Sequence, residues 1–243
     1  MPVLKNSTIA KRFFGSQEIT KSFYGSTLIW AKAESEVAPF GYRQGYTLSG
    51  SSATRSFAGV DIGPVNASRD VIIGIPTAQA ADSQVASVTV NGIPAQLLAK
   101  AGTEGGAWNT FNSIWKVRVP TGATGTVDVA HANATPYTHI MVFSGVNVIV
   151  SDVDSRSSGV GSVQSTIVID TATVGHMIYA FIVAASATNL TWTGITEVQE
   201  FVTPSSNRIG LAEKIAVEGN NTLTCAVPSG TRVALIAFSA GNN

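Results

Sequence analysis

The stretch THIMVFSG at residues 138–145 returns near the end of the chain as TRVALIAFSA at residues 231–240. Both copies are apolar runs of strand length that end on the same Phe-Ser pair followed by a small residue. Two further pairs of stretches recur in the same order, SVTVNGI (87–93) with NLTWTGI (189–195) and TVDVA (126–130) with TLTCA (222–226). The offset between copies falls from about 102 to about 95 residues as the intervening segments shorten, as expected after a duplication. The sequence therefore predicts two similar halves.

Both halves have the sequence pattern of strands. The chain contains 23 Gly and 9 Pro, which separate short runs rich in Val, Ile and Thr, and no long stretch has helical periodicity. Asn91-Gly92 is the typical centre of a two-residue hairpin, and a turn is also expected over residues 132–138. We predict an all-β protein, an antiparallel, jelly-roll-like β-sandwich over residues 45–243 with two similar five-strand halves. Two separate small domains are the alternative, although no linker divides the halves.

The composition excludes several classes of protein. Of 243 residues, 44% are hydrophobic and 12% charged, and 15 basic side chains balance 15 acidic ones. Disordered chains show the opposite composition, and nucleic-acid binding needs clustered Lys and Arg. The longest apolar run, Met177–Ala185, is far shorter than the about 20 residues that cross a bilayer. We therefore expect a folded protein with no nucleic-acid partner, no membrane span and, at its N-terminus, no secretory signal.

A second repeat occupies the N-terminus. IAKRFFGS (9–16) returns ten residues later as ITKSFYGS (19–26), followed by a further apolar segment at residues 28–30. We predict a small β-meander over residues 1–32, joined by a linker at residues 33–44. Strands this short are unstable alone, so their apolar side chains need a partner surface. The predicted attachment residues are Ile9, Phe13, Phe14, Ile19, Phe23, Tyr24, Leu28 and Trp30.

No motif for catalysis or metal binding stands out. Cys225, the only cysteine, fits a buried strand position, and His131 and His139 could face each other across the predicted turn but lack a third ligand. Asp152 and Asp154 suit either a cation or acid and base chemistry, or else a polar loop in which Arg156 neutralises one carboxylate. The remaining acidic candidates are too widely spread to predict a glycosidase pair: Glu104, Glu197, Glu200, Glu213 and Glu218. We predict no enzyme, no metal and no cofactor.

One loop has the residue types of a sugar-binding site. Trp108 stands beside Asn109 and Asn112, so that an indole face is flanked by amides. The alternative is that Trp108 covers the end of the sandwich core. Trp115 and Trp192 lie within predicted strands and are expected in the core.

Four stretches together resemble a β-sandwich domain of small virion proteins of tailed bacteriophages: FAGVDIG (57–63), RDVIIGI (69–75), VTVNGIPA (88–95) and IWKVRVPTG (114–122). The repeat at residues 9–30 is similar to the N-terminal element of phage minor tail, fibre and spike proteins. The resemblance implies a virion appendage or decoration protein without a cofactor.

Three functions are compatible with these features. The first is an oligomeric structural component of the virion, located in the particle, attached by residues 1–32 to other virion proteins. The second is an adhesin that binds host-surface glycan through Trp108, Asn109 and Asn112. The third is a glycan depolymerase that uses Asp152 and Asp154. We expect the first, in the form of a homo-oligomer.

Overall fold

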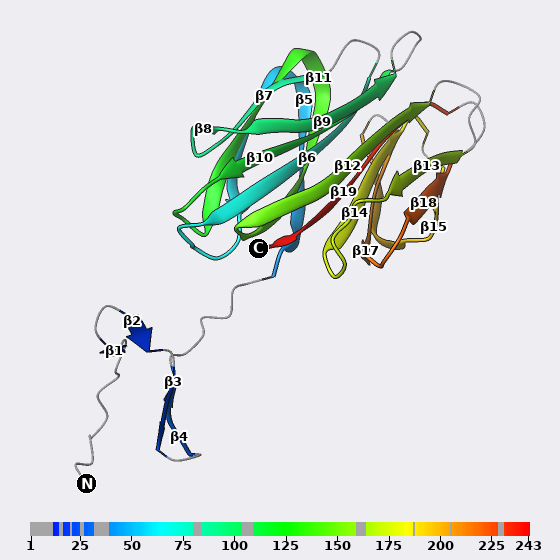
Figure 1. The fold of residues 1–243 in the computed structure, drawn as a ribbon. Coiled ribbons are helices and arrows are strands. Elements are labelled where there is room, and N and C mark those ends of the chain that lie inside the picture. Colours follow the sequence, from blue (N-terminus) through cyan, green and yellow to red (C-terminus); the bar gives the residue numbers. More distant parts are fainter. Residues whose placement is uncertain are drawn as a thin grey trace. The chain divides into compact units, whose positions relative to one another are not determined.

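The protein divides into two units, Met1–Val37 and Ala38–Asn243. A computed structural model describes the backbone of four N-terminal strands and, in the larger unit, residues 39–79, 84–103, 109–158, 164–186, 188–204, 206–227 and 231–243. All the regular elements in these residues are strands (Figure 1). The all-β class predicted from the sequence is confirmed.

The smaller unit contains two antiparallel hairpins. β1 (Arg12–Phe14) pairs with β2 (Gln17–Ile19), and β3 (Lys21–Tyr24) pairs with β4 (Thr27–Ala31). Each pair is a two-stranded sheet of its own, so among the described residues there is no continuous meander. In both hairpins a Gly-Ser pair separates the two strands, because each copy of the ten-residue repeat supplies its own Gly-Ser.

The first half of the larger unit, residues 39–146, curls one sheet into two layers. Its strands are β5 (Gly41–Asp61), β6 (Arg69–Gln79), β7 (Val85–Val90), β8 (Ile93–Pro94), β9 (Gln96–Thr103), β10 (Asn109–Arg118) and β11 (Thr124–Val146). β5 and β11 are long, paired strands that take part in both layers. The start of β11 pairs with β7, whereas its end pairs with β6, which leads on to β10 and β9.

The second half repeats this strand order with separate sheets. Its strands are β12 (Val148–Ser158), β13 (Gln164–Ile169), β14 (Met177–Ala184), β15 (Thr191–Thr193), β16 (Thr196–Val202), β17 (Arg208–Ile215), β18 (Asn221–Ala226) and β19 (Val233–Asn242). The order β12-β19-β14-β17-β16 matches β5-β11-β6-β10-β9, and β13-β18-β15 matches β5-β11-β7. The duplication seen in the sequence is therefore present in the fold.

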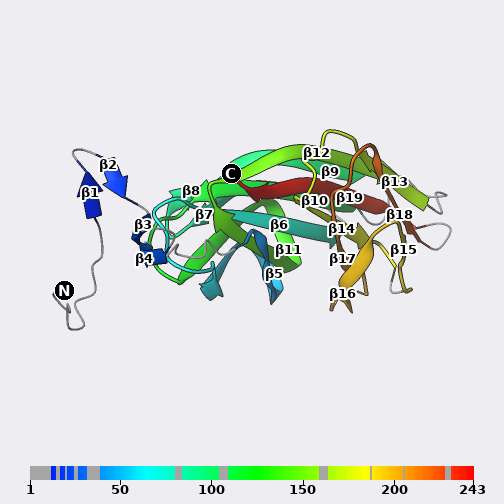
Figure 2. The same ribbon diagram turned by 60° about the horizontal axis from the view of Figure 1, so that its bottom comes forward.

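The four layers enclose three apolar cores. One core lies between the two layers of the first half, and another between the two layers of the second half. The third lies between the halves, where the β6-β10 layer packs on the β14-β19 layer; Figures 1 and 2 both show β12 and β19 beside β9 and β10. The expected single sandwich is thus two sandwiches packed face to face. Strands such as β14, buried on both faces, carry the continuous apolar sequence that this position requires.

Several local predictions hold. Asn91 and Gly92 have φ angles of 51° and 75°, as their hairpin turn needs. Trp115 lies in the first-half core and Trp192 packs against the second-half core, where Cys225 is also buried.

One local prediction was wrong. The turn expected over residues 132–138 is part of β11, which continues through an irregular register between Ala130 and Tyr137. The predicted linker at residues 33–44 includes the boundary between the two units and the start of β5 at Gly41. A Cβ on Gly45 would lie 2.9 Å from Cε1 of His139, so this glycine permits close packing of β5 on β11.

Candidate functional site

The predicted attachment residues fall mostly on the N-terminal hairpins. Their positions are Phe13 and Phe14 on β1, Ile19 on β2, Phe23 and Tyr24 on β3, and Leu28 and Trp30 on β4. Ile9 and the side chains of the other seven lie outside what the structure describes. Their role in attachment stays a prediction.

The structure describes two of the three predicted sugar-binding residues. Trp108 lies outside the described residues, and Asn109 and Asn112 are buried on β10. The Asn112 side chain is 1% exposed. Its Nδ2 donates to the carbonyl oxygens of Phe181 at 3.1 Å and Ala234 at 2.6 Å. The amide nitrogen of Asn112 therefore joins the two halves of the protein.

The two predicted carboxylates each have their own partner. Asp154 pairs with Arg156 at 3.1 Å and accepts the backbone N–H of Ser155, which is the neutralisation expected from the sequence. Asp152 accepts the N–H of Thr171 at 3.1 Å. Within the described ranges, no group of three or more His, Cys, Asp or Glu side chains could hold a metal ion.

The two histidines on β11 are packing residues. His131 Nε2 lies 2.8 Å from the hydroxyl of Thr138, and His139 Nδ1 lies 2.8 Å from that of Thr47. The His139 ring also packs on Phe201, with centroids 4.3 Å apart. Burial lowers the pKa of His139 to about 3, so the ring is neutral at physiological pH.

Two buried charged residues hold strand ends together. The Arg69 guanidinium donates to the carbonyl oxygens of Gly63, Pro64, Val119 and Thr121. Asp70 accepts two hydrogen bonds from Arg118 and one from the N–H of Val148, where the second half begins. Both side chains are thus held in place, Arg69 by four carbonyl oxygens and Asp70 by a cationic partner and a backbone N–H.

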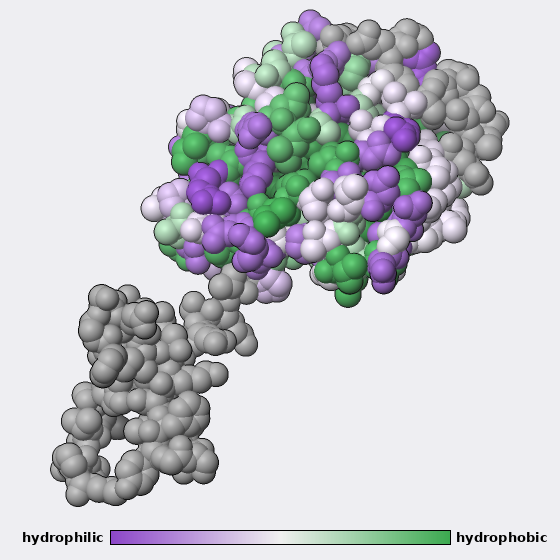
Figure 3. All heavy atoms as spheres, in the orientation of Figure 1, coloured by the Kyte–Doolittle hydropathy of each residue, from purple (hydrophilic) through white to green (hydrophobic). Residues whose placement is uncertain are grey.

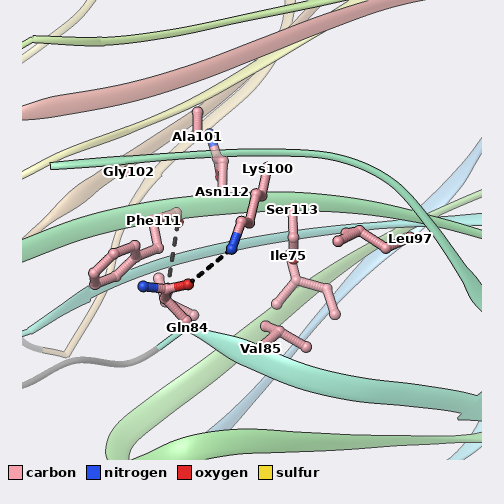
Figure 4. A pocket seen from close by; sticks show the side chains of 11 residues that line it. Ile75, Gln84, Val85, Leu97, Lys100, Ala101, Gly102, Phe111, Asn112 and Ser113 are labelled. Carbon is pink, nitrogen blue, oxygen red and sulfur yellow. Dashed lines mark hydrogen bonds between the residues drawn. The ribbon is translucent and has the colours of Figure 1, made fainter.

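The candidate site is a pocket of about 250 Å³ at the open side of the first sandwich, below called the Lys100 pocket. Figure 4 shows Phe111, Ser113 and Gln84 around the hollow, with the Lys100 side chain reaching across it to Gln84. The lining residues are Ile75, Thr77, Gln84, Val85, Leu97, Lys100, Ala101, Gly102, Phe111, Asn112 and Ser113. They come from β6, β9 and β10 and from the start of β7. The described lining thus combines apolar and polar surface in similar amounts and contains one cationic side chain.

A β-bulge positions two of these residues. Ile114 pairs with Ala99 but Trp115 pairs with Leu97, so Leu98 is an extra residue in β9. Residues three apart in a regular strand point to opposite faces. The extra residue of the bulge shifts this alternation by one, so that residues three apart across it point to the same face. Leu97 and Lys100 therefore both line the pocket, and Leu97 is 40% exposed at its rim. Figure 3 shows apolar residues exposed among polar ones on one face of the larger unit.

The second half has the same bulge with different side chains. Leu211 pairs with Gln199 but Ala212 pairs with Glu197, so Val198 is the extra residue in β16. Ser113 pairs with Ile75 and Lys100, whereas Gly210 pairs with Ile182 and Glu200. Glu200 therefore occupies the position of Lys100, and Glu197 that of Leu97.

Side chains fill this second position. A Cβ on Gly210 would lie 2.6 Å from Cδ1 of Leu190 and 3.4 Å from Cζ2 of Trp192. Glu200 pairs with Arg208 at 3.0 Å and accepts the N–H of Leu190. Burial and the neighbouring Glu200 raise the pKa of Glu197. Glu197 and Glu200 are three residues apart, which in a regular strand would place them on opposite faces. The bulge at Val198 places them on the same face of β16.

Comparisons with family models, curated proteins and solved structures find no match to this chain. The described part of the chain has no helix long and apolar enough to cross a membrane.

Proposed function

We propose that this protein is a structural component of a tailed-phage virion, an oligomeric tail or head appendage or decoration protein anchored by its N-terminal hairpins. The proposal rests on the resemblance in sequence and, above all, on the division of the chain. The larger unit has three apolar cores of its own, whereas the smaller one offers two separate two-stranded sheets. Hairpins of this size are marginally stable alone.

Such hairpins gain stability when they add strands to, or bury side chains against, another protein. Their repeated aromatic residues supply the apolar surface for that contact. The partners are other virion proteins and further copies of this chain. A surface with few charges favours close contact between subunits, because few ions lose their hydration.

Deletion of residues 1–37 tests the proposal. The remaining body should stay folded and soluble, because every described core contact of the three clusters lies within it. It should no longer enter phage particles, as measured by mass spectrometry of purified virions beside the full chain. Continued incorporation of the truncated protein at the full level would contradict anchoring by the hairpins. Electron microscopy of intact particles would then locate the chain.

A second candidate function is binding of host-surface glycan. The observation that favours it is the Lys100 pocket, whose walls include the strand residues that flank the Trp108 loop. Loss of binding to host cells in a Trp108→Ala variant that still enters particles would support it. A depolymerase is the least favoured function, because Asp152 and Asp154 are each engaged by a partner of their own.

A further inference from the structure

The duplication leaves one half open and fills the other. At the bulged edge of the second half, Leu190 and Trp192 pack down onto Gly210. At the corresponding place in the first half stands Ser113, beside a pocket of about 250 Å³. Both halves have equivalent strands, so the fold itself does not require a hollow at this position. Among the described residues, side chains occupy the position in the second half and leave it open in the first, which indicates a use specific to the first half.

The walls of the pocket offer apolar contact and one available hydroxyl proton. Ile75, Val85 and Phe111 supply apolar surface. The Ser113 hydroxyl accepts a hydrogen bond from the Trp115 indole at 2.9 Å, so its own proton remains for a ligand. An apolar wall with a few convergent polar groups is the usual composition of a small-molecule site.

The charge of the pocket sets the class of ligand. Lys100 is the only ionisable residue among the described residues that line it. Its amine donates to the neutral Gln84 amide oxygen at 3.3 Å, and no described carboxylate lies within ion-pair distance of it. Glu200, at the same position in the other half, has Arg208 as its partner. Among the described residues, the first-half cation therefore has no counter-ion such as the one that the second-half anion has.

We propose that the Lys100 pocket binds an acidic monosaccharide, with the sugar carboxylate on the Lys100 amine in place of the Gln84 oxygen. The C–H face of the ring lies against Phe111 and Leu97, and a ring hydroxyl accepts from Ser113. The volume suits one sugar residue rather than a chain. The proposal deepens the glycan-binding function above, on which it rests, and does not depend on attachment to a virion.

Titration calorimetry on the full chain tests the proposal with three probes. Glucuronate carries the carboxylate and the sugar ring, glucose lacks the carboxylate, and cyclohexanecarboxylate lacks the hydroxyls. Glucuronate should bind once per chain, about three- to thirty-fold more tightly than either other probe, as expected for one charge-assisted contact at a partly exposed site. Absence of glucuronate binding, or equal affinity for glucose, would overturn the proposal. Equal affinity for cyclohexanecarboxylate would overturn its sugar component.

Substitutions of the exposed Lys100 change the charge of the pocket without removing a residue from the core. Lys100→Met should bring glucuronate down to the affinity of glucose, Lys100→Glu should remove glucuronate binding, and Lys100→Arg should preserve it. Lys214→Met, on β17 and outside the pocket, is the matched control and should bind like the wild type. Unchanged glucuronate affinity in Lys100→Met would refute the assigned contact. A protein that binds host cells but not glucuronate would keep the adhesin function and lose this site.

Discussion

Gly74 lies directly opposite the ring of Phe181 across the boundary between the two halves. A Cβ added to Gly74 would come within 3.1 Å of Phe181 Cζ, which is closer than ordinary packing allows. Phe181 is fully buried in the central core that both halves build. The absence of a side chain at one position of β6 therefore sets how closely the two sandwiches approach.

Substitution of Gly74 should weaken this contact in proportion to the volume added. We expect Gly74→Ala to lower the free energy of unfolding by about 1–3 kcal/mol, and Gly74→Val to lower it further, because the rigid ring must shift. Denaturant unfolding measures both. Gly41→Ala is the control, since a Cβ there would lie at an ordinary 3.7 Å from the Tyr179 hydroxyl. Equal stability of the Gly74 and Gly41 variants would contradict the close approach.

Asn112 supplies polar contacts across the same boundary. Asn112→Ala removes both donors to the Phe181 and Ala234 carbonyl oxygens and should cost about 1–3 kcal/mol of unfolding free energy. The exposed Asn220→Ala variant should stay within about 0.5 kcal/mol of the wild type. A glycan role for Asn112 predicts instead a stable variant with weaker sugar binding. Thermal unfolding and glycan titration of one preparation distinguish the two roles.

The repeats and turn residues were sufficient to predict strands, the duplication and the Asn91-Gly92 hairpin. They did not predict that each half closes its own sandwich. Strand periodicity shows which faces are apolar, and β14 is apolar on both. That pattern does not say which sheet covers each face, so one sandwich and two packed sandwiches remain equally compatible with it.

The candidate site was missed for a geometric reason. Leu97 and Lys100 point the same way only because Leu98 is an extra residue in its strand, and a single inserted residue leaves no recognisable mark in the sequence. One signal was available in the repeat itself. Leu97 and Lys100 align with Glu197 and Glu200, and the opposite charges of Lys100 and Glu200 at one corresponding position indicate different uses of the two copies.

Stability should fall in mild acid because of His139. Its pKa is lowered from 6.5 to about 3 in the folded protein, so below pH 6.5 the unfolded chain binds a proton that the folded chain excludes. The contribution of His139 is thus fully present above pH 6.5 and decreases by up to about 1.4 kcal/mol per pH unit as the pH falls toward 3. Denaturant unfolding at about pH 7 and pH 5 measures the decrease. A His139→Gln variant should lose much of this slope, and an unchanged slope would assign the decrease to other groups.

Asp70 links the two halves of the larger unit through Val148, at the start of β12. Asp70 is 2% exposed, and its carboxylate accepts from Arg118 and from the N–H of Val148. Lys116 reaches the same carboxylate at 3.5 Å and donates to the Val148 carbonyl oxygen. Asp70→Asn leaves these donors without their charged acceptor, so we expect a loss of roughly 2–4 kcal/mol in the free energy of unfolding. Asp154→Asn breaks a pair whose Arg156 side chain is 56% exposed and should cost less than about 1 kcal/mol. Equal losses in the two variants would show that Asp70 acts as an ordinary surface charge and does not hold the halves together.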